Sequence, residues 1–277
     1  MLFDSHTHLN YEGYTDKDRE ELFSIIEKSD ISYAMDAGYD LESSYMAVKH
    51  AQRFKWCYAI VGCHPHEAGN FTEEEFVLLK ALAQKEGAKA IGEIGLDFYR
   101  NLSDKEDQRF WFRRQIRLAN ELKMPIVIHS RDAHQEVMDI LKEEGAFSKE
   151  RKSWFPKKNS PLSEEDARVL LHCYSGSREQ AIQYIKLGAT VSLAGPVTYK
   201  NARILREVAE GVPLTDLLIE TDAPYLTPEP LRGQQNISPN VRYVAQKVAE
   251  IKGLSYEEVA LETKRNGMRF FNIKEQE

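Results

Sequence analysis

Short apolar runs alternate with amphipathic stretches along almost the whole chain. Several runs, such as IVIH and RVLLH, are apolar nearly throughout, which is typical of parallel strands covered on both faces. The stretches between them repeat their apolar positions at helical spacing, as in residues 104–122. The pattern predicts strands at residues 2–5, 32–37, 57–62, 89–94, 125–129, 168–172, 189–193 and 217–221.

Eight strands alternating with helices, at about 35 residues per unit, indicate an α/β fold of the (β/α)8 TIM-barrel type. A doubly wound open sheet is the alternative. The 277 residues match one barrel, and no repeat or Gly/Ser linker divides them, so we expect a single domain over residues 1–277. One polar, basic segment at residues 147–161 interrupts the alternation and is expected to form a long loop before the sixth strand.

The composition narrows the class of protein. With 42% hydrophobic and 29% charged residues, the chain is unlike disordered, collagen-like or membrane proteins. A net charge of −7 argues against coating nucleic acid through bulk positive charge, but it permits an enzyme that binds phosphate locally. The chain shows no signal-peptide pattern, no membrane-spanning run and three cysteines without a CxxC pair. We therefore expect a cytoplasmic monomer without a membrane partner.

Polar residues of metal-binding type follow the predicted strands. His6 and His8 stand at i and i+2 after the first strand, a spacing that points both imidazoles to one side of an extended chain. In a barrel the carboxyl ends of the strands meet on the face that holds active sites. Later strands end in further candidate ligands, namely Glu93, His129, His172 and Asp222.

Four histidines and two carboxylates exceed the three or four ligands of one catalytic metal. They suit two divalent ions, with one carboxylate bridging them. The absence of thiolates from this set favours Zn²⁺ or Mn²⁺ over Ca²⁺ and leaves Mg²⁺ open. Each residue alone has an ordinary structural interpretation, and it is their coincidence at separate strand ends that indicates a site.

Other polar residues have simpler expected roles. His50 lies within a helical pattern and is expected to be solvated. His134 is expected in the first turn of the helix after the fifth strand, where exposure and a role in the site are both open. Cys63 and Cys173 are expected to be small core residues rather than ligands.

Six motifs in a fixed order carry a family resemblance: FDSHTHLN at 3–10, VGCHPH at 61–66, IGEIGLDFYR at 91–100, PIVIHSRDA at 125–133, LHCYSGS at 171–177 and IETDAPYLTP at 219–228. With them the chain resembles the TatD family of metal-dependent hydrolases, which is related to the amidohydrolase-type barrels. The resemblance implies that His6, His8 and Asp222 bind one metal ion, that Glu93 bridges, and that His129 and His172 hold the second. It further implies that His64 lies beside the metals and contacts substrate.

The activity usually described for this family is that of a metal-dependent deoxyribonuclease acting on DNA ends or single strands. The resemblance therefore implies hydrolysis of phosphodiester bonds, with DNA as the partner and with Asp222 and Glu93 as catalytic residues. Asp222 would accept a proton from the attacking water. One departure is the family's RGxxN(E)P signature, which reads RGQQNISP at 232–239 and is one residue longer here.

Other functions remain open on the same barrel. An amidohydrolase, a lactonase or a small phosphoesterase would use similar binuclear chemistry, and the fold does not choose among them. Amidohydrolases often carry a metal-bridging lysine at the fourth strand, where this chain has Glu93 and Ile94. A non-catalytic metal-binding scaffold is a further alternative, which the complete ligand set disfavours.

Candidate substrate contacts follow from the chemistry of a nucleic-acid strand. Arg131 and Arg232 are candidates for phosphate binding because a guanidinium fork matches phosphate oxygens. A salt bridge from Arg131 to a nearby aspartate, Asp97 or Asp132, is the alternative. Tyr99, Phe98 and Tyr225 are candidates for stacking on an unpaired base, with core packing as the alternative.

The basic segment has its own prediction. Five cations against Glu150 give a charge of +4 over residues 149–158, with Trp154 and Phe155 interleaved. We expect this segment to help guide a nucleic-acid strand through its charge. Its cations are Lys149, Arg151, Lys152, Lys157 and Lys158.

Overall fold

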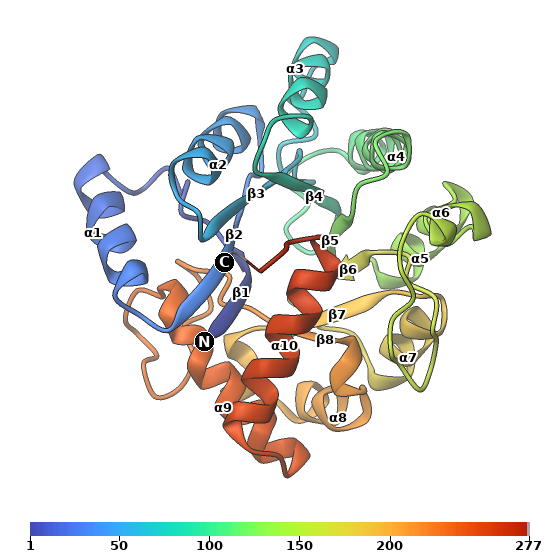
Figure 1. Ribbon diagram of the computed structural model, residues 1–277. Helices are drawn as coiled ribbons and strands as arrows, with labels where there is room; N and C mark the ends of the chain where they lie inside the picture. Colours follow the sequence, from blue (N-terminus) through green and yellow to red (C-terminus); the bar gives the residue numbers. More distant parts are fainter. Residues whose placement is uncertain (276–277) are drawn as a thin grey trace.

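The computed structural model describes residues 1–275 and contains an eight-stranded sheet wound into a barrel, with helices packed around it (Figure 1). The strands follow one another in sequence order, from β1 to β8, and each neighbouring pair is parallel. The circle closes where Thr7 bridges Ala223, and the Asp222 amide donates to the His6 carbonyl at 2.9 Å. This sequential, closed order confirms the barrel and excludes the open doubly wound sheet, whose strand order reverses at a switch point.

All eight predicted strands are present, with small shifts at their ends. The strands are β1 Leu2–Thr7, β2 Ile31–Ala37, β3 Cys57–Val61, β4 Ala88–Asp97, β5 Ile126–Arg131, β6 Val169–Leu171, β7 Thr190–Leu193 and β8 Leu217–Ile219. The helices are α1 Asp16–Glu27, α2 Leu41–Arg53, α3 Glu73–Ala83, α4 Lys105–Glu121, α5 His134–Glu143, α6 Lys149–Ser153, α7 Arg178–Lys186, α8 Arg203–Gly211, α9 Val241–Lys252 and α10 Tyr256–Phe270, with short 3-10 turns at Gly195–Thr198, Leu214–Asp216 and Ser238–Asn240. Among the described residues, no helix is long and apolar enough to cross a membrane.

Side chains fill the interior of the barrel and close one of its ends. Phe3, Met35, Ile60 and Val127 point inward from four strands and are almost fully buried. Phe271, just after α10, stacks on Phe3 with ring centroids 5.9 Å apart. Helix α10 therefore covers the amino-terminal end of the strands (Figure 1), and the functional residues gather at the opposite, carboxyl end.

The segment 147–161 differs from the prediction. Part of it forms α6, and the Arg151 side chain is fully buried, where it donates to the carbonyls of Ala167 and Met124 at 2.8 and 2.7 Å. Lys158 is also buried, with its Nζ 2.6 Å from the Asp216 carboxylate. These two cations are therefore structural.

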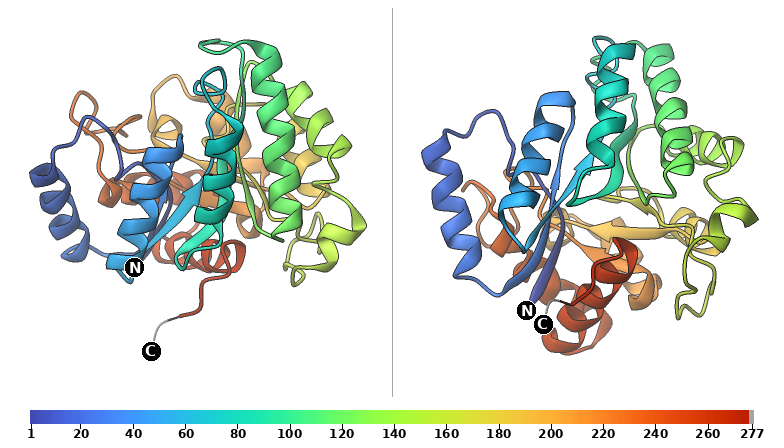
Figure 2. Two further views of the ribbon diagram at one scale, coloured as in Figure 1. Left: turned by 90° about the horizontal axis from the view of Figure 1, so that it is seen from above. Right: turned by 45° about the horizontal axis from the view of Figure 1, so that its top comes forward.

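The position of this segment is equally decisive. It joins α5 to β6 and lies at the amino-terminal end of the strands, on the side of the N-terminus in Figure 2. Lys152 and Lys157 pair with Glu165 and Glu164. The prediction that the segment guides nucleic acid toward the site is wrong, because the segment lies at the far end of the barrel and most of its charge is neutralised.

Candidate metal centre

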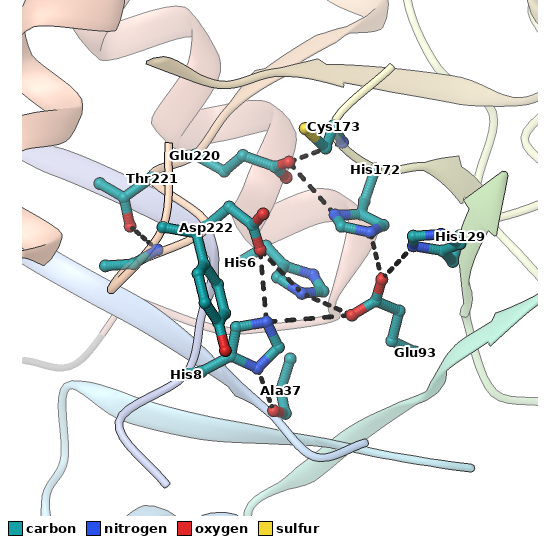
Figure 3. A network of polar contacts seen from close by, with 12 residues as sticks. His6, His8, Ala37, Glu93, His129, His172, Cys173, Glu220, Thr221 and Asp222 are labelled. Atoms are coloured by element: carbon teal, nitrogen blue, oxygen red, sulfur yellow. Dashed lines mark hydrogen bonds and ion pairs between the residues drawn. The ribbon is translucent and has the colours of Figure 1, made fainter. Parts of the chain in front are cut away.

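Six predicted ligands from five strands converge at the carboxyl end of the barrel (Figure 3). Their side chains are buried or nearly so, and each lies within or just after its strand. They are His6 of β1, His8 directly after β1, Glu93 of β4, His129 of β5, His172 after β6 and Asp222 after β8. The barrel thus brings together residues that are more than 200 positions apart in the sequence.

Glu93 lies at the middle of the cluster, and its two oxygens face different imidazoles. Oε2 lies 3.2 Å from His6 Nε2 and 3.9 Å from His8 Nε2. Oε1 lies 2.7 Å from His129 Nδ1 and 2.6 Å from His172 Nε2. Burial alone would raise the pKa of Glu93, but the imidazoles around it hold that pKa well below its usual range. This geometry is the one expected of a carboxylate between two positive centres.

One side of the cluster contains His6 of β1 and His8, which directly follows that strand. His8 Nδ1–H donates a hydrogen bond to the carbonyl of Ala37 at 2.8 Å, which leaves Nε2 facing the Asp222 carboxylate at 3.3 Å. Burial would lower the pKa of His8, but the hydrogen bond and charge of Asp222 raise it to about 9. The negative charges of Asp222 and Glu93, which stabilise the protonated form of His8, would also attract a metal cation.

His6 gives a second indication of a missing partner. Its side chain is fully buried, and within the part of the chain that the structure describes neither ring nitrogen has hydrogen-bond geometry; Nδ1 has no partner, and the nearest carboxylate contact of Nε2 is with Glu93 Oε2 at 3.2 Å. Buried polar groups are nearly always paired, so such an imidazole indicates an ion or water that completes the site. The cluster contains nitrogen and oxygen donors without a thiolate, a set that fits a divalent cation.

The ligand atoms form three sets in which all atoms lie within 4.8 Å of one another: His6, His8 and Asp222; His6, Glu93 and His172; and His64, Glu93 and His129. The first set is the one that the resemblance implies. The third brings in His64, whose Nε2 lies 3.5 Å from Glu93 Oε1, so that it is placed as well for a cation as for substrate. Burial and the neighbouring His129 lower the pKa of His64 to about 3, which keeps its imidazole neutral.

Two further carboxylates, Glu220 and Asp97, lie against the imidazoles of the cluster. The sequence pattern did not predict a role in the cluster for either of them. Glu220 is fully buried and lies 3.3 Å from His172 Nδ1; it also accepts from the Cys173 amide at 2.6 Å. Asp97 lies 3.3 Å from His129 Nε2 and 2.8 Å from His66 Nε2. An acidic residue at the end of an apolar strand was the available signal, because burial there requires a polar partner.

His50 corrects a further prediction. Its side chain is buried on α2, and its Nδ1 lies 2.7 Å from the Asp36 carboxylate. Asp36 also accepts the amides of Leu9 and Asn10, at 2.9 and 3.2 Å, which fixes the turn after His8. His50 is therefore a structural residue that supports the loop next to the cluster, and the expectation of a solvated position is wrong.

Two exposed arginines lie at the rim of this end, one over an exposed tyrosine and the other over a half-buried one. Arg131 lies over the ring of Tyr99 at 4.2 Å, and Arg232 lies over the ring of Tyr199 at 4.3 Å. Within residues 1–275 neither arginine is ion-paired, so the alternative of a salt bridge to Asp97 or Asp132 is not observed. Stacking on tyrosine leaves the guanidinium edge free for an anion.

The remaining predicted residues have mixed outcomes. Phe98 packs against the core under Lys105, so packing is its role here. His134 begins α5, with its Nδ1 2.8 Å from Ser130 Oγ. Cys63 is buried as expected, whereas Cys173 is partly exposed beside His172. Neither cysteine joins a ligand set among the described residues.

Comparison with known proteins identifies the family. The family model described as TatD related DNase matches residues 3–272. The uncharacterized metal-dependent hydrolase YabD of Bacillus subtilis is 40% identical over 273 residues, which cover 99% of this chain and 100% of that protein. The 3'-5' ssDNA/RNA exonuclease TatD of Erwinia tasmaniensis is 31% identical over 263 residues, covering 93% of this chain and 95% of that protein.

A solved structure supports the same fold. The crystal structure of YjjV, a TatD homologue from Escherichia coli K12, superposes with a TM-score of 0.83 at 24% identity, and the match covers 99% of this chain and 98% of that one. At this identity the match shows the barrel alone, while the family match and the relatives above 30% identity establish the class of protein. The chain belongs to the TatD family and is a metal-dependent hydrolase.

Proposed function

We propose that this protein is a deoxyribonuclease that uses two divalent ions to hydrolyse phosphodiester bonds at the ends of single-stranded DNA. The observation that carries the proposal is Glu93, whose two oxygens face two separate groups of imidazoles. The relatives named 3'-5' ssDNA/RNA exonuclease TatD, at 31% and 32% identity, support the choice of substrate. Arg131 and Arg232 at the rim, which form no ion pair among the described residues, supply the positive charge that a phosphate needs.

The donor atoms fit two ions. His6, His8 and Asp222 would hold one, His129 and His172 the other, and Glu93 would bridge them. Bound Zn²⁺, Mn²⁺ or Mg²⁺ would lower the pKa of water at the site and stabilise the attacking and leaving oxygens of an in-line displacement. The all-nitrogen-and-oxygen donor set favours Zn²⁺ or Mn²⁺ as the resident metal.

The chain's own residues would divide the remaining work. Asp222, with 15% of its side chain exposed, would accept the proton of the attacking water. Burial would raise the pKa of Asp222, but its hydrogen bond with His8 lowers it and keeps the carboxylate ionised to act as a base. Arg131 and Arg232 would bind phosphate oxygens, while His64 and Tyr99 would contact the strand beside them.

The setting of the enzyme follows from two smaller observations. The three cysteines are free, which supports a reducing compartment, and we propose the cytoplasm. The candidate ligands all come from one chain, so we propose that the enzyme works as a monomer.

A metal-reconstituted activity panel tests the function. Wild type and Asp222→Asn are compared on single-stranded DNA, RNA, a model phosphodiester and an N-acyl amino acid. We expect wild type to cleave the DNA, and Asp222→Asn to lose about 10²- to 10⁴-fold in kcat because it removes the proton acceptor. Undiminished cleavage by Asp222→Asn would contradict the mechanism, and hydrolysis of the N-acyl amino acid alone would favour an amidohydrolase.

Metal content tests the ligand assignment separately. We expect two ions per chain in wild type and one in a His129→Ala/His172→Ala double variant. Retention of both ions by the double variant would refute the assignment of the second site.

A further inference from the structure

A cavity of about 500 Å³ lies between α1 and the segment that follows β8. Both segments are neighbours in Figure 1, where α1 is blue and the segment after β8 is orange. The walls are aromatic and aliphatic, from Tyr11, Tyr14, Leu22, Ile25 and Tyr225. Its volume falls within the roughly 300–1,000 Å³ of pockets that bind small organic groups.

Aromatic rings connect this cavity to the candidate metal centre. Tyr225 is 50% exposed, and its ring centroid lies 6.2 Å from that of His8 and 5.8 Å from that of Tyr11. Tyr11 in turn lies 5.3 Å from Tyr14, with their rings nearly perpendicular. Tyr225 therefore both lines the cavity and contacts His8, so the cavity adjoins the candidate metal centre.

The charge of the cavity walls indicates which kind of chemical group fits in the cavity. Of the described residues that line the cavity, Asp18 and Glu21 are acidic and none is lysine or arginine. Such a lining disfavours a phosphate, which would face carboxylates with no cation nearby. The other polar groups at the edge of the cavity are uncharged: the side chain of Gln235 forms a hydrogen bond with the Tyr14 hydroxyl. Aromatic faces with acceptors at their edge suit a flat, uncharged ring that carries N–H donors.

We propose that this cavity binds the nucleobase of a nucleotide next to the hydrolysed phosphodiester bond. The inference rests on the proposed nuclease function, and it adds a base-binding subsite that the metal centre alone does not provide. The phosphate lies with the metal ligands and the rim arginines, and the base lies between α1 and Tyr225. A base can enter only when it is unpaired and unstacked, so the subsite selects single strands or frayed ends.

Strands with and without a base test the subsite. Single-stranded oligonucleotides carry adenine or an abasic tetrahydrofuran unit at each of three positions on either side of the cleaved bond. For wild type we expect kcat/KM to fall about 5- to 150-fold when the base is missing at one position, as for loss of one stacked base. In Tyr225→Ala this adenine-to-abasic ratio falls toward one.

Two further variants keep the test sharp. Glu21→Lys places a cation at the exposed edge of the cavity and reduces the same ratio without removing an aromatic wall. Tyr45→Ala is the matched control, since Tyr45 is 51% exposed on α2 and does not line the cavity; it should keep both the activity and the ratio of wild type. Thermal unfolding midpoints confirm that each variant is folded.

The outcomes separate this inference from the proposed function. An unchanged ratio in both Tyr225→Ala and Glu21→Lys, or a wild-type ratio of one at every position, overturns the subsite even when DNA is cleaved. Binding is measured in parallel by the anisotropy of fluorescein-labelled strands with the metals chelated. If no phosphodiester is cleaved, but wild type binds the adenine strand more tightly than the abasic one and Tyr225→Ala does not, the nuclease proposal fails while binding of a base at this cavity is retained.

Discussion

Glu220 provides the most direct test of how the candidate metal centre is held in place. Its Oε1 accepts from the Cys173 amide at 2.6 Å and lies 3.3 Å from His172 Nδ1, while its Oε2 accepts from Ser192 Oγ at 2.7 Å. Glu220→Gln keeps the shape but replaces one acceptor with an NH₂ group and removes the charge that attracts His172 Nδ1–H. The His172 ring then loses the partner that directs its Nε2 toward Glu93.

The size of the effect follows from these contacts. A hydrogen bond to a charged group contributes about 1.5–3 kcal/mol, so we expect Glu220→Gln to lower the free energy of unfolding by ~1–3 kcal/mol. Glu220→Ala leaves two or three buried donors without an acceptor and should cost about 3–6 kcal/mol. Loss of an outer partner of a metal ligand typically weakens metal affinity 10- to 100-fold, and we expect a decrease of about this size in Glu220→Gln.

The assay combines two measurements on one preparation. Urea denaturation gives the free energy of unfolding, and competition with a chelator gives the affinity for Zn²⁺ or Mn²⁺. Glu86→Gln serves as the matched control, because Glu86 is exposed after α3, and neither quantity should change. If Glu220→Gln binds metal as tightly as wild type, the carboxylate does not orient His172 and the reasoning is refuted.

Three further predictions address the barrel, its pH dependence and the corrected basic segment. Gly95→Ala should unfold the protein or abolish metal binding, because φ of Gly95 is +151° and a Cβ there would collide with the carbonyl of the paired His129. A soluble variant with the stability of wild type in urea denaturation would contradict this prediction. Hydrogen bonds from Arg117 and Arg113 of α4 lower the pKa of Glu144, so the ionised carboxylate stabilises the protein above pH ~4.5 and this contribution is lost as the pH falls. We expect Glu144→Gln to lower the free energy of unfolding by up to about 1 kcal/mol at pH 7. Urea denaturation should also show a weaker pH dependence of that free energy between about pH 5 and 3. Arg151→Gln should lower the free energy of unfolding by about 3 kcal/mol, because buried carbonyls lose their hydrogen-bond donor. Lys149→Gln should leave DNA binding and its salt dependence unchanged in a titration. Weaker binding by Lys149→Gln would instead support a role of the segment in guiding nucleic acid.

The barrel and its candidate ligands could be read from local sequence patterns. Strands covered on both faces are apolar nearly throughout, so runs such as IVIH can be recognised as buried strands. A polar residue at the end of such a run is then a candidate site residue. His6, Glu93 and His172 are recognisable from this local pattern alone. The order of elements then placed them at one end of a closed sheet, as the structure shows.

Residues whose role depends on a distant partner were not readable in this way. The helical pattern around His50 indicates a helix, but only the packing of α2 against β2 buries that imidazole beside Asp36. Arg151 has the sequence appearance of a solvated cation, and its burial depends on carbonyls at the ends of other strands. Charge in a sequence does not tell whether a side chain is buried or paired, so the prediction that the +4 segment guides a nucleic-acid strand failed.

The sequence by itself determined the class of fold, the order and approximate positions of the strands, and the chemical types of the candidate ligands, because apolar periodicity and strand-end polarity are local properties. Tertiary structure alone decided which oxygens of Glu93 face which imidazoles, which carboxylates support them and where the aromatic cavity opens. The physical reason is that burial and electrostatic pairing depend on distances across the barrel. Those distances are set by closure of the sheet, which joins residues separated by most of the chain.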